Sequence, residues 1–141
     1  YPNNPFFHRY YARVLYANGR FTQAEPVCKK ILEKIDSAQV GYEATSGRYA
    51  AFFLGQIHEA RGKLEDAKNY YLKSKLYSEK VNATDAGYYL YTLISLGEIA
   101  EKQGNKAEAK KYFTEVKKRS NRKDETFKDA KKRLKKLEKN D

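Results

Sequence analysis

The side chains of this 141-residue chain that could take part in catalysis are few and far apart. Neither His8 nor His58 has a cysteine or a second histidine at the spacing that zinc sites use. Cys28 is the single cysteine, and no neighbouring pattern supplies the base that would activate a thiol nucleophile. We therefore expect all three side chains to serve in packing.

Acidic side chains do not form a catalytic pattern either. The pairs Glu65–Asp66 and Glu98–Glu101 lie on amphipathic segments, where a solvated helix face is the simplest interpretation. The sequence contains no Gly-x-x-x-x-Gly-Lys-Ser/Thr loop for phosphates, no Gly-x-Ser-x-Gly elbow and no Gly-x-Gly-x-x-Gly fingerprint. These observations predict a protein that is not an enzyme and that has no metal site and no cofactor.

Three glycines at nearly even spacing indicate instead a chain built from repeats. In each copy an alanine follows the glycine by five residues, and an aromatic residue or a cysteine follows that alanine by four. The copies are Gly19-Ala24-Cys28, Gly62-Ala67-Tyr71 and Gly104-Ala109-Phe113. A glycine accepts a left-handed backbone without steric cost, so each of the three is expected to end a helix.

Small residues are also expected where two helices cross closely. Ala12, Gly55 and Gly97 meet that need on the first helices of the pairs, and the repeated alanines meet it on the second helices. This whole pattern, over roughly residues 5 to 118, resembles the tetratricopeptide repeat. The resemblance implies an all-α fold, a right-handed superhelical solenoid of three helix-turn-helix units with a C-terminal capping helix.

The resemblance also supplies the expected boundaries. Residues 1–4 would end a preceding repeat, 5–40, 41–82 and 83–120 would be the three repeats, and 121–141 would be a basic capping helix. The glycines are separated by 43 and 42 residues, against about 34 in the standard repeat. That spacing is similar to long-helix variants of the bacterial type. Because residues 1–4 look like the end of a preceding repeat, we expect a fragment of a larger repeat protein.

Local signals predict where helices start and how the extra residues fold. Thr22 with Glu25, and Asn105 with Glu108, have the spacing of a helix-capping pair, and Pro26 is expected in the first turn of its helix. Residues 37–42 are expected to form a loop before a helix that starts near Ala44. The apolar residues of the second insertion, Leu72, Leu76 and Tyr77, are expected to continue one stripe of a longer helix.

The family resemblance implies that first helices line a concave groove that binds a peptide or helix of another protein. The residues at the groove positions are Phe6, Arg9, Tyr10, Arg13, Tyr16, Tyr49, Phe52, Phe53, Gln56, Glu59, Tyr91, Ile94, Ser95, Glu98 and Lys102. A clamp for C-terminal carboxylates is not expected, because Ile94 and Glu98 stand where its third repeat carries cations. Some of the aromatic residues would instead pack against a preceding repeat.

Positive charge gathers at the C-terminal end, where residues 101–141 hold 16 Lys and Arg against 8 Asp and Glu. A last helix is expected from Asp124, with Phe127, Ala130, Leu134 and Leu137 on one face. Its candidate polyanion contacts are Lys128, Lys131, Lys132, Arg133, Lys135 and Lys136. Binding of nucleic acid or of an anionic membrane is thus one alternative function. A purely structural role within a larger protein is a second alternative.

We do not expect nucleic acid to be the main partner, since no nucleic-acid-binding module accompanies these residues. No stretch of about 18 apolar residues occurs, so no membrane-spanning segment is predicted. The sequence leaves the cellular compartment and the oligomeric state open.

Overall fold

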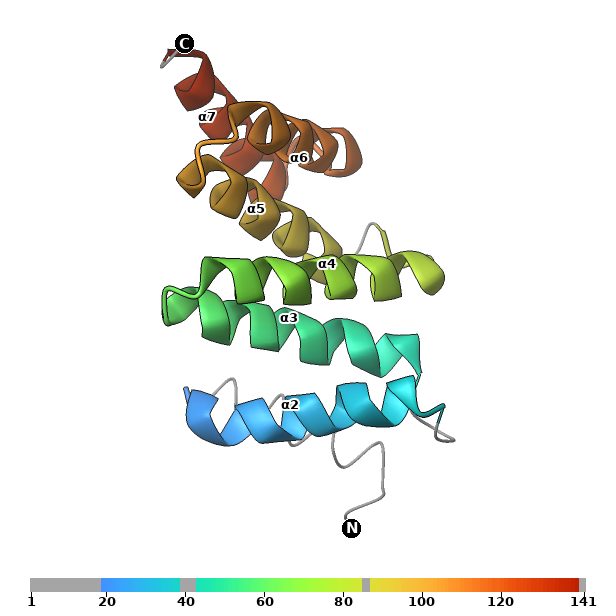
Figure 1. Cartoon of the computed structure of the whole chain (residues 1–141). Coiled ribbons are helices and arrows are strands. Elements are labelled where there is room, and N and C mark those ends of the chain that lie inside the picture. The colour runs from blue at the N-terminus through green and yellow to red at the C-terminus, as the bar shows by residue number, and fades with distance from the viewer. Residues whose placement is uncertain (1–18, 39–42, 85–86, 140–141) are drawn as a thin grey trace. The chain divides into compact units, whose positions relative to one another are not determined.

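The computed structural model of the chain describes residues 19–38, 43–84 and 87–139 (Figure 1). Within these ranges its regular secondary structure consists of α-helices joined by short turns. The helices are α2 (Phe21–Asp36), α3 (Ala44–Ala60), α4 (Leu64–Lys80), α5 (Gly87–Lys102), α6 (Lys106–Arg119) and α7 (Glu125–Lys139). The expected all-α fold class is confirmed. No helix in the described ranges is long and apolar enough to cross a bilayer.

The chain forms two compact units. The first, Tyr1–Asn82, contains α2, α3 and α4, and α3 packs against both of its neighbours (Figure 1). The second, Ala83–Asp141, contains α5 and α6 as a packed pair, with α7 lying mainly on α6 and touching α5 over a shorter stretch. Each unit therefore has a helical hairpin, α3–α4 or α5–α6, at its centre.

The turn glycines adopt the backbone that the sequence predicts. Gly62 joins α3 to α4 with φ of +77°, and Gly104 joins α5 to α6 with φ of +79°. Gly19, just before α2, has φ of +71°. All three lie in the left-handed region, where a side chain would be strained. The prediction that they end helices is confirmed for Gly62 and Gly104, whereas the helix that Gly19 would end lies outside the described residues.

Close helix crossings explain the second set of glycines. A Cβ placed on Gly55 of α3 would lie 2.6 Å from the ring of Tyr71 on α4. A Cβ on Gly97 of α5 would lie 2.5 Å from the ring of Phe113 on α6. The two hairpins therefore use the same contact, in which a ring of the second helix occupies the space above a glycine of the first.

The repeated alanines lie where the second helices meet the core. Ala24, Ala67 and Ala109 are all fully buried, each with 0% exposure. In the second unit, Ala109 belongs to a cluster with Phe113, Leu93 and, from α7, Ala130. The predicted role of small residues at the crossings is therefore confirmed for the glycines and alanines of the described helices, whereas Ala12 lies outside the described residues.

One of the two predicted capping pairs is present. Asn105 caps α6, because its side-chain oxygen accepts a hydrogen bond from the backbone N–H of Glu108 at 3.1 Å. Its amide nitrogen donates to the carboxylate of Glu108 at 2.9 Å. The start of α6 is therefore stabilised by side chains as the sequence predicts.

The other predicted pair is wrong. The helix α2 begins at Phe21, one residue before Thr22, and its N-cap residue Arg20 makes no side-chain capping bond. Glu25 points elsewhere, since its carboxylate accepts a 2.7 Å hydrogen bond from Arg61, just after α3. That bond to Arg61, with the nearby Lys29, lowers the pKa of Glu25.

The early start of α2 also corrects the position of Pro26. Pro26 lies inside the helix, in its second turn and not in its first. A proline there has no N–H to give to the carbonyl of Thr22, so one hydrogen bond of the helix is missing.

The helix after the first insertion starts at Ala44, as the sequence predicts, and α2 ends at Asp36. Residues 39–42 of the expected loop lie outside the described residues. The second insertion is helical through Lys80. Its apolar residues do not all share one face, however, since Tyr77 lies on a different side from Leu72 and Leu76. Tyr77 is 5% exposed, whereas Leu72 and Leu76 are 38% and 51% exposed. The expected single stripe is therefore wrong, because the packing partner α3 covers only one side of α4.

The last helix starts one residue after the predicted Asp124 and packs through most of its predicted face, although Phe127 is only partly buried. It runs from Glu125, and Ala130 and Leu137 are buried while Leu134 is partly buried. The hydroxyl groups of Ser120 and Thr126 form a 2.8 Å hydrogen bond where the chain enters α7. The apolar stripe of α7 is therefore used in packing within the second unit.

We expect Asn105→Ala to lower the free energy of unfolding by about 1 kcal/mol, because it removes the capping bonds of α6. Thr22→Ala is the matched control, since Thr22 is exposed and caps nothing. Urea denaturation followed by circular dichroism measures both. Equal losses for the two variants would contradict the assigned cap.

Candidate interaction surfaces

The α3 residues at the expected groove positions divide into buried and accessible groups. Phe52 and Phe53 are only 5% and 3% exposed, and their rings meet edge to face at 6.1 Å. Tyr49, Gln56 and Glu59 are partly exposed. The accessible part of this face is therefore polar and aromatic, with the two phenylalanines below it.

Two of the accessible α3 side chains are held in place. The hydroxyl of Tyr49 accepts a 2.8 Å hydrogen bond from Arg48, whose guanidinium also lies 4.5 Å from the Tyr49 ring centre. The carboxylate of Glu59 accepts a 2.8 Å hydrogen bond from the hydroxyl of Tyr71 on α4. Such positioned groups lose little freedom when they bind a partner.

On α5, the expected groove positions form a line along one side of the helix. Tyr91, Ser95, Glu98 and Lys102 recur at intervals of four and three residues, which places them on one face. Tyr91 is 50% exposed and Lys102 is exposed, whereas Ser95 and the neighbouring Ile94 are buried at 8% and 5%. Tyr91 is the large exposed side chain of this face.

The remaining expected groove residues, Phe6, Arg9, Tyr10, Arg13 and Tyr16, lie outside the described residues, as does His8. The arginine end of the groove therefore stays a prediction.

Glu98 has a partner that the sequence did not indicate. Its carboxylate forms a 3.0 Å ion pair with Arg133 of α7, and Arg133 also donates to Asp129 at 2.9 Å. The guanidinium of Arg133 lies 5.7 Å from the ring centre of Phe113. Arg133 thus links the last helix to α5. From the sequence, only its pair with Asp129, four residues away on the same helix, could be predicted.

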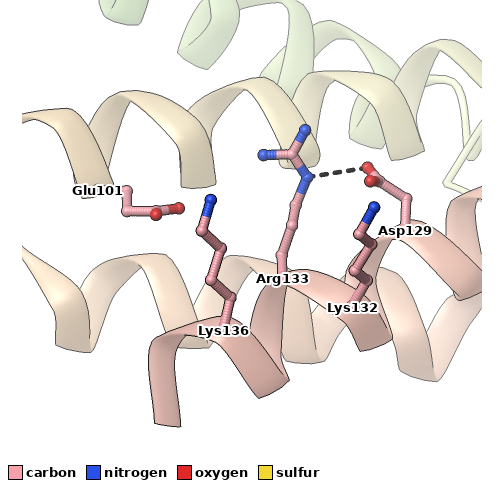
Figure 2. A pocket seen from close by; sticks show the side chains of 5 residues that line it. All are labelled: Glu101, Asp129, Lys132, Arg133 and Lys136. Atoms are coloured by element: carbon pink, nitrogen blue, oxygen red, sulfur yellow. Dashed lines mark hydrogen bonds and ion pairs between the residues drawn. The ribbon is translucent and has the colours of Figure 1, made fainter. Parts of the chain in front are cut away.

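A charged cleft lies between α5 and α7 beside this ion pair. It consists of two adjoining hollows of about 220 Å³ each, which share Glu101 and Arg133 in their lining. Figure 2 shows Lys132, Arg133 and Lys136 reaching from α7 toward α5, with Glu101 on the opposite wall. The ammonium groups of Lys132 and Lys136 make no ion pair with a described carboxylate.

Cys28 and His58 have the surroundings of packing residues. Cys28 is fully buried, and burial, together with the charge of Glu25, raises the pKa of its thiol to about 12. A thiol with so high a pKa is a poor nucleophile at neutral pH. His58 is 6% exposed, with its Nδ1 atom 2.8 Å from the carbonyl oxygen of Leu54 in its own helix.

Among the residues that the structure describes, no group of three or more His, Cys, Asp and Glu side chains is placed to hold a metal ion. The features suited to molecular recognition are the accessible faces of α3 and α5 and the basic outer side of α7.

Comparison with known families places part of the chain in a repeat family. A sequence model described as tetratricopeptide repeat matches residues 47–121, which is more than half of the chain and extends from α3 to just after α6. The matched stretch contains both hairpins in which a glycine packs under a ring. No curated protein matches the sequence.

Proposed function

Because the chain belongs to the tetratricopeptide repeat family, whose members generally act as scaffolds for protein–protein interactions, we propose that it binds a peptide or helix of a partner protein along its first helices. The role is non-catalytic. The observation that carries the proposal is the exposed Tyr91 on the face of α5 that also holds Glu98 and Lys102.

The chemistry of this face suits a peptide. Aromatic side chains are among the residues that contribute most to protein interfaces. Tyr91 lies about 16 Å from Lys102 along the helix axis, at a rise of about 1.5 Å per residue, so one short peptide can contact both. Glu98 is held between them by Arg133 and offers an acceptor in a defined position.

The test uses the full chain to select binders from a displayed library of random peptides. The affinity of the selected peptides is then measured for Tyr91→Ala and for Leu76→Ala, a control with similar exposure, 51%, on α4. We expect Tyr91→Ala to weaken binding by about tenfold or more, the size of an interface hot spot. Leu76→Ala should change the affinity less than twofold.

The choice of Tyr91 follows from burial. Phe52 is an expected groove residue, but truncating a side chain with 5% exposure would also open a cavity in the core. Equal effects of the Tyr91 and Leu76 variants, or a failure to select any peptide, would count against the proposal.

A further inference from the structure

The exposed side of α7 carries a line of lysines, one of which, Lys132, also lines the cleft toward α5. Lys128, Lys132, Lys135 and Lys139 recur at intervals of four, three and four residues, and all four are exposed. We call these four residues the lysine ridge. They span about 16 Å of the helix at a rise of about 1.5 Å per residue, on the side opposite the buried Ala130 and Leu137.

The charge of the lysine ridge is almost uncompensated. Lys132, Lys135 and Lys139 make no ion pair or hydrogen bond with a described residue. Lys128 has only a loose contact of 3.7 Å with Glu125, and these two side chains are 60% and 87% exposed. Like charges along one helix face repel one another, so an anionic partner would relieve a repulsion that the chain itself leaves in place.

We propose that the lysine ridge is a docking surface for an acidic α-helix of a partner protein. On a helix with carboxylates at intervals of four, three and four residues, neighbouring carboxylates are about 5–6 Å apart. The lysines of the ridge have the same spacing. Several pairs can then form at once. The ridge lies on α7, so this surface is additional to the peptide-binding faces of α3 and α5.

Two other anionic partners fit the surroundings less well. A membrane-binding amphipathic helix inserts its apolar face into the bilayer, but that face of α7 is packed against the rest of its unit. Base-specific or stacking recognition of nucleic acid uses arginine, amide or aromatic side chains. The ridge contains only lysines, which would contact phosphates alone.

The cleft next to the ridge also favours a protein partner. Its lining includes the carboxylates of Glu101 and Asp129 beside Lys132 and Lys136 (Figure 2). Phosphates that follow the α5 side of the ridge would approach these carboxylates and be repelled. A helix of mixed sequence can instead place a lysine or arginine near Glu101, while its own carboxylates meet the ridge.

The experiment measures fluorescence anisotropy of a labelled 18-residue helical peptide, with glutamates at the matching spacing, added to the full chain. The ridge variant combines Lys128→Glu, Lys132→Glu and Lys135→Glu. The control variant combines Lys30→Glu, Lys63→Glu and Lys80→Glu, which changes the net charge equally at exposed positions of the first unit. Circular dichroism verifies that both variants keep their helices.

We expect the ridge variant to lose at least tenfold in affinity and the control less than twofold. Binding should also weaken steeply with added salt, because all the contacts are exposed. Tyr91→Ala should leave it unchanged, so this proposal and the peptide-binding proposal fail separately.

Three results would overturn the proposal. Equal losses in the two triple variants would show an effect of net charge alone. Equal affinity for a peptide of the same composition with its glutamates at scrambled positions would show that the matching spacing does not contribute to binding. Tighter binding of a 20-base-pair DNA duplex, or of vesicles with anionic lipid, would show that another class of polyanion is the preferred partner.

Discussion

Phe113→Ala is expected to lower the free energy of unfolding by about 3–5 kcal/mol, the usual cost of removing a fully buried aromatic ring. Phe113 is 0% exposed and belongs to the core of the second unit, with Leu93, Val116 and Ala130. Its ring also fills the space above Gly97. The variant would therefore leave a cavity at the point where α5, α6 and α7 are held together.

Urea denaturation of the full chain, followed by circular dichroism, measures this loss. Phe127→Ala is a suitable control, because Phe127 is only partly buried and has Lys117 5.8 Å from its ring centre. Its truncation should cost clearly less. Core truncations of this kind cost about 3–5 kcal/mol. A loss below about 1 kcal/mol for Phe113→Ala would therefore contradict the assignment of its ring to the core of the second unit.

Gly55→Ala is expected to destabilise the protein by about 1–3 kcal/mol, the range found for overpacked cores. The direction is informative, because the same change inside an unobstructed helix normally stabilises it by about 0.5–1 kcal/mol. Here the added Cβ would lie 2.6 Å from the ring of Tyr71, which is 0% exposed and has little room to move.

Gly87→Ala is the matched control for Gly55→Ala. Gly87 is the first residue of α5, and a Cβ there would meet only the ring of Tyr91 at 3.8 Å, an ordinary contact. It should be neutral or slightly stabilising. Repeating Gly55→Ala in a Tyr71→Leu background should remove most of its cost, and an unchanged cost there would contradict the proposed clash.

The faces available for binding differ from those that the repeat pattern alone predicts. The pattern ranks Phe52, Phe53 and Ile94 with the groove residues, yet all three are at most 5% exposed. Tyr91 and Lys102 are exposed at positions from the same pattern. The pattern therefore predicts which helix side is relevant, whereas burial decides which residues on it a partner can reach.

The sequence by itself determined the features that depend on local backbone and helix periodicity. The left-handed turns at Gly62 and Gly104 follow from the steric freedom of glycine, and the cap at Asn105 follows from side-chain reach over three residues. The apolar stripe of α7 follows from its 3.6-residue period. Each of these requires information from only a few neighbouring residues.

Only the tertiary structure decided the contacts between side chains that are distant in sequence. Glu25 pairs with Arg61, and α2 begins before Thr22, so the expected capping pair does not form. Glu98 pairs with Arg133, and Leu76 remains exposed on a helix whose other side is packed. The physical reason is that a charged or apolar residue contacts whatever group the packed helices bring near it, and that neighbour is not encoded in the local pattern.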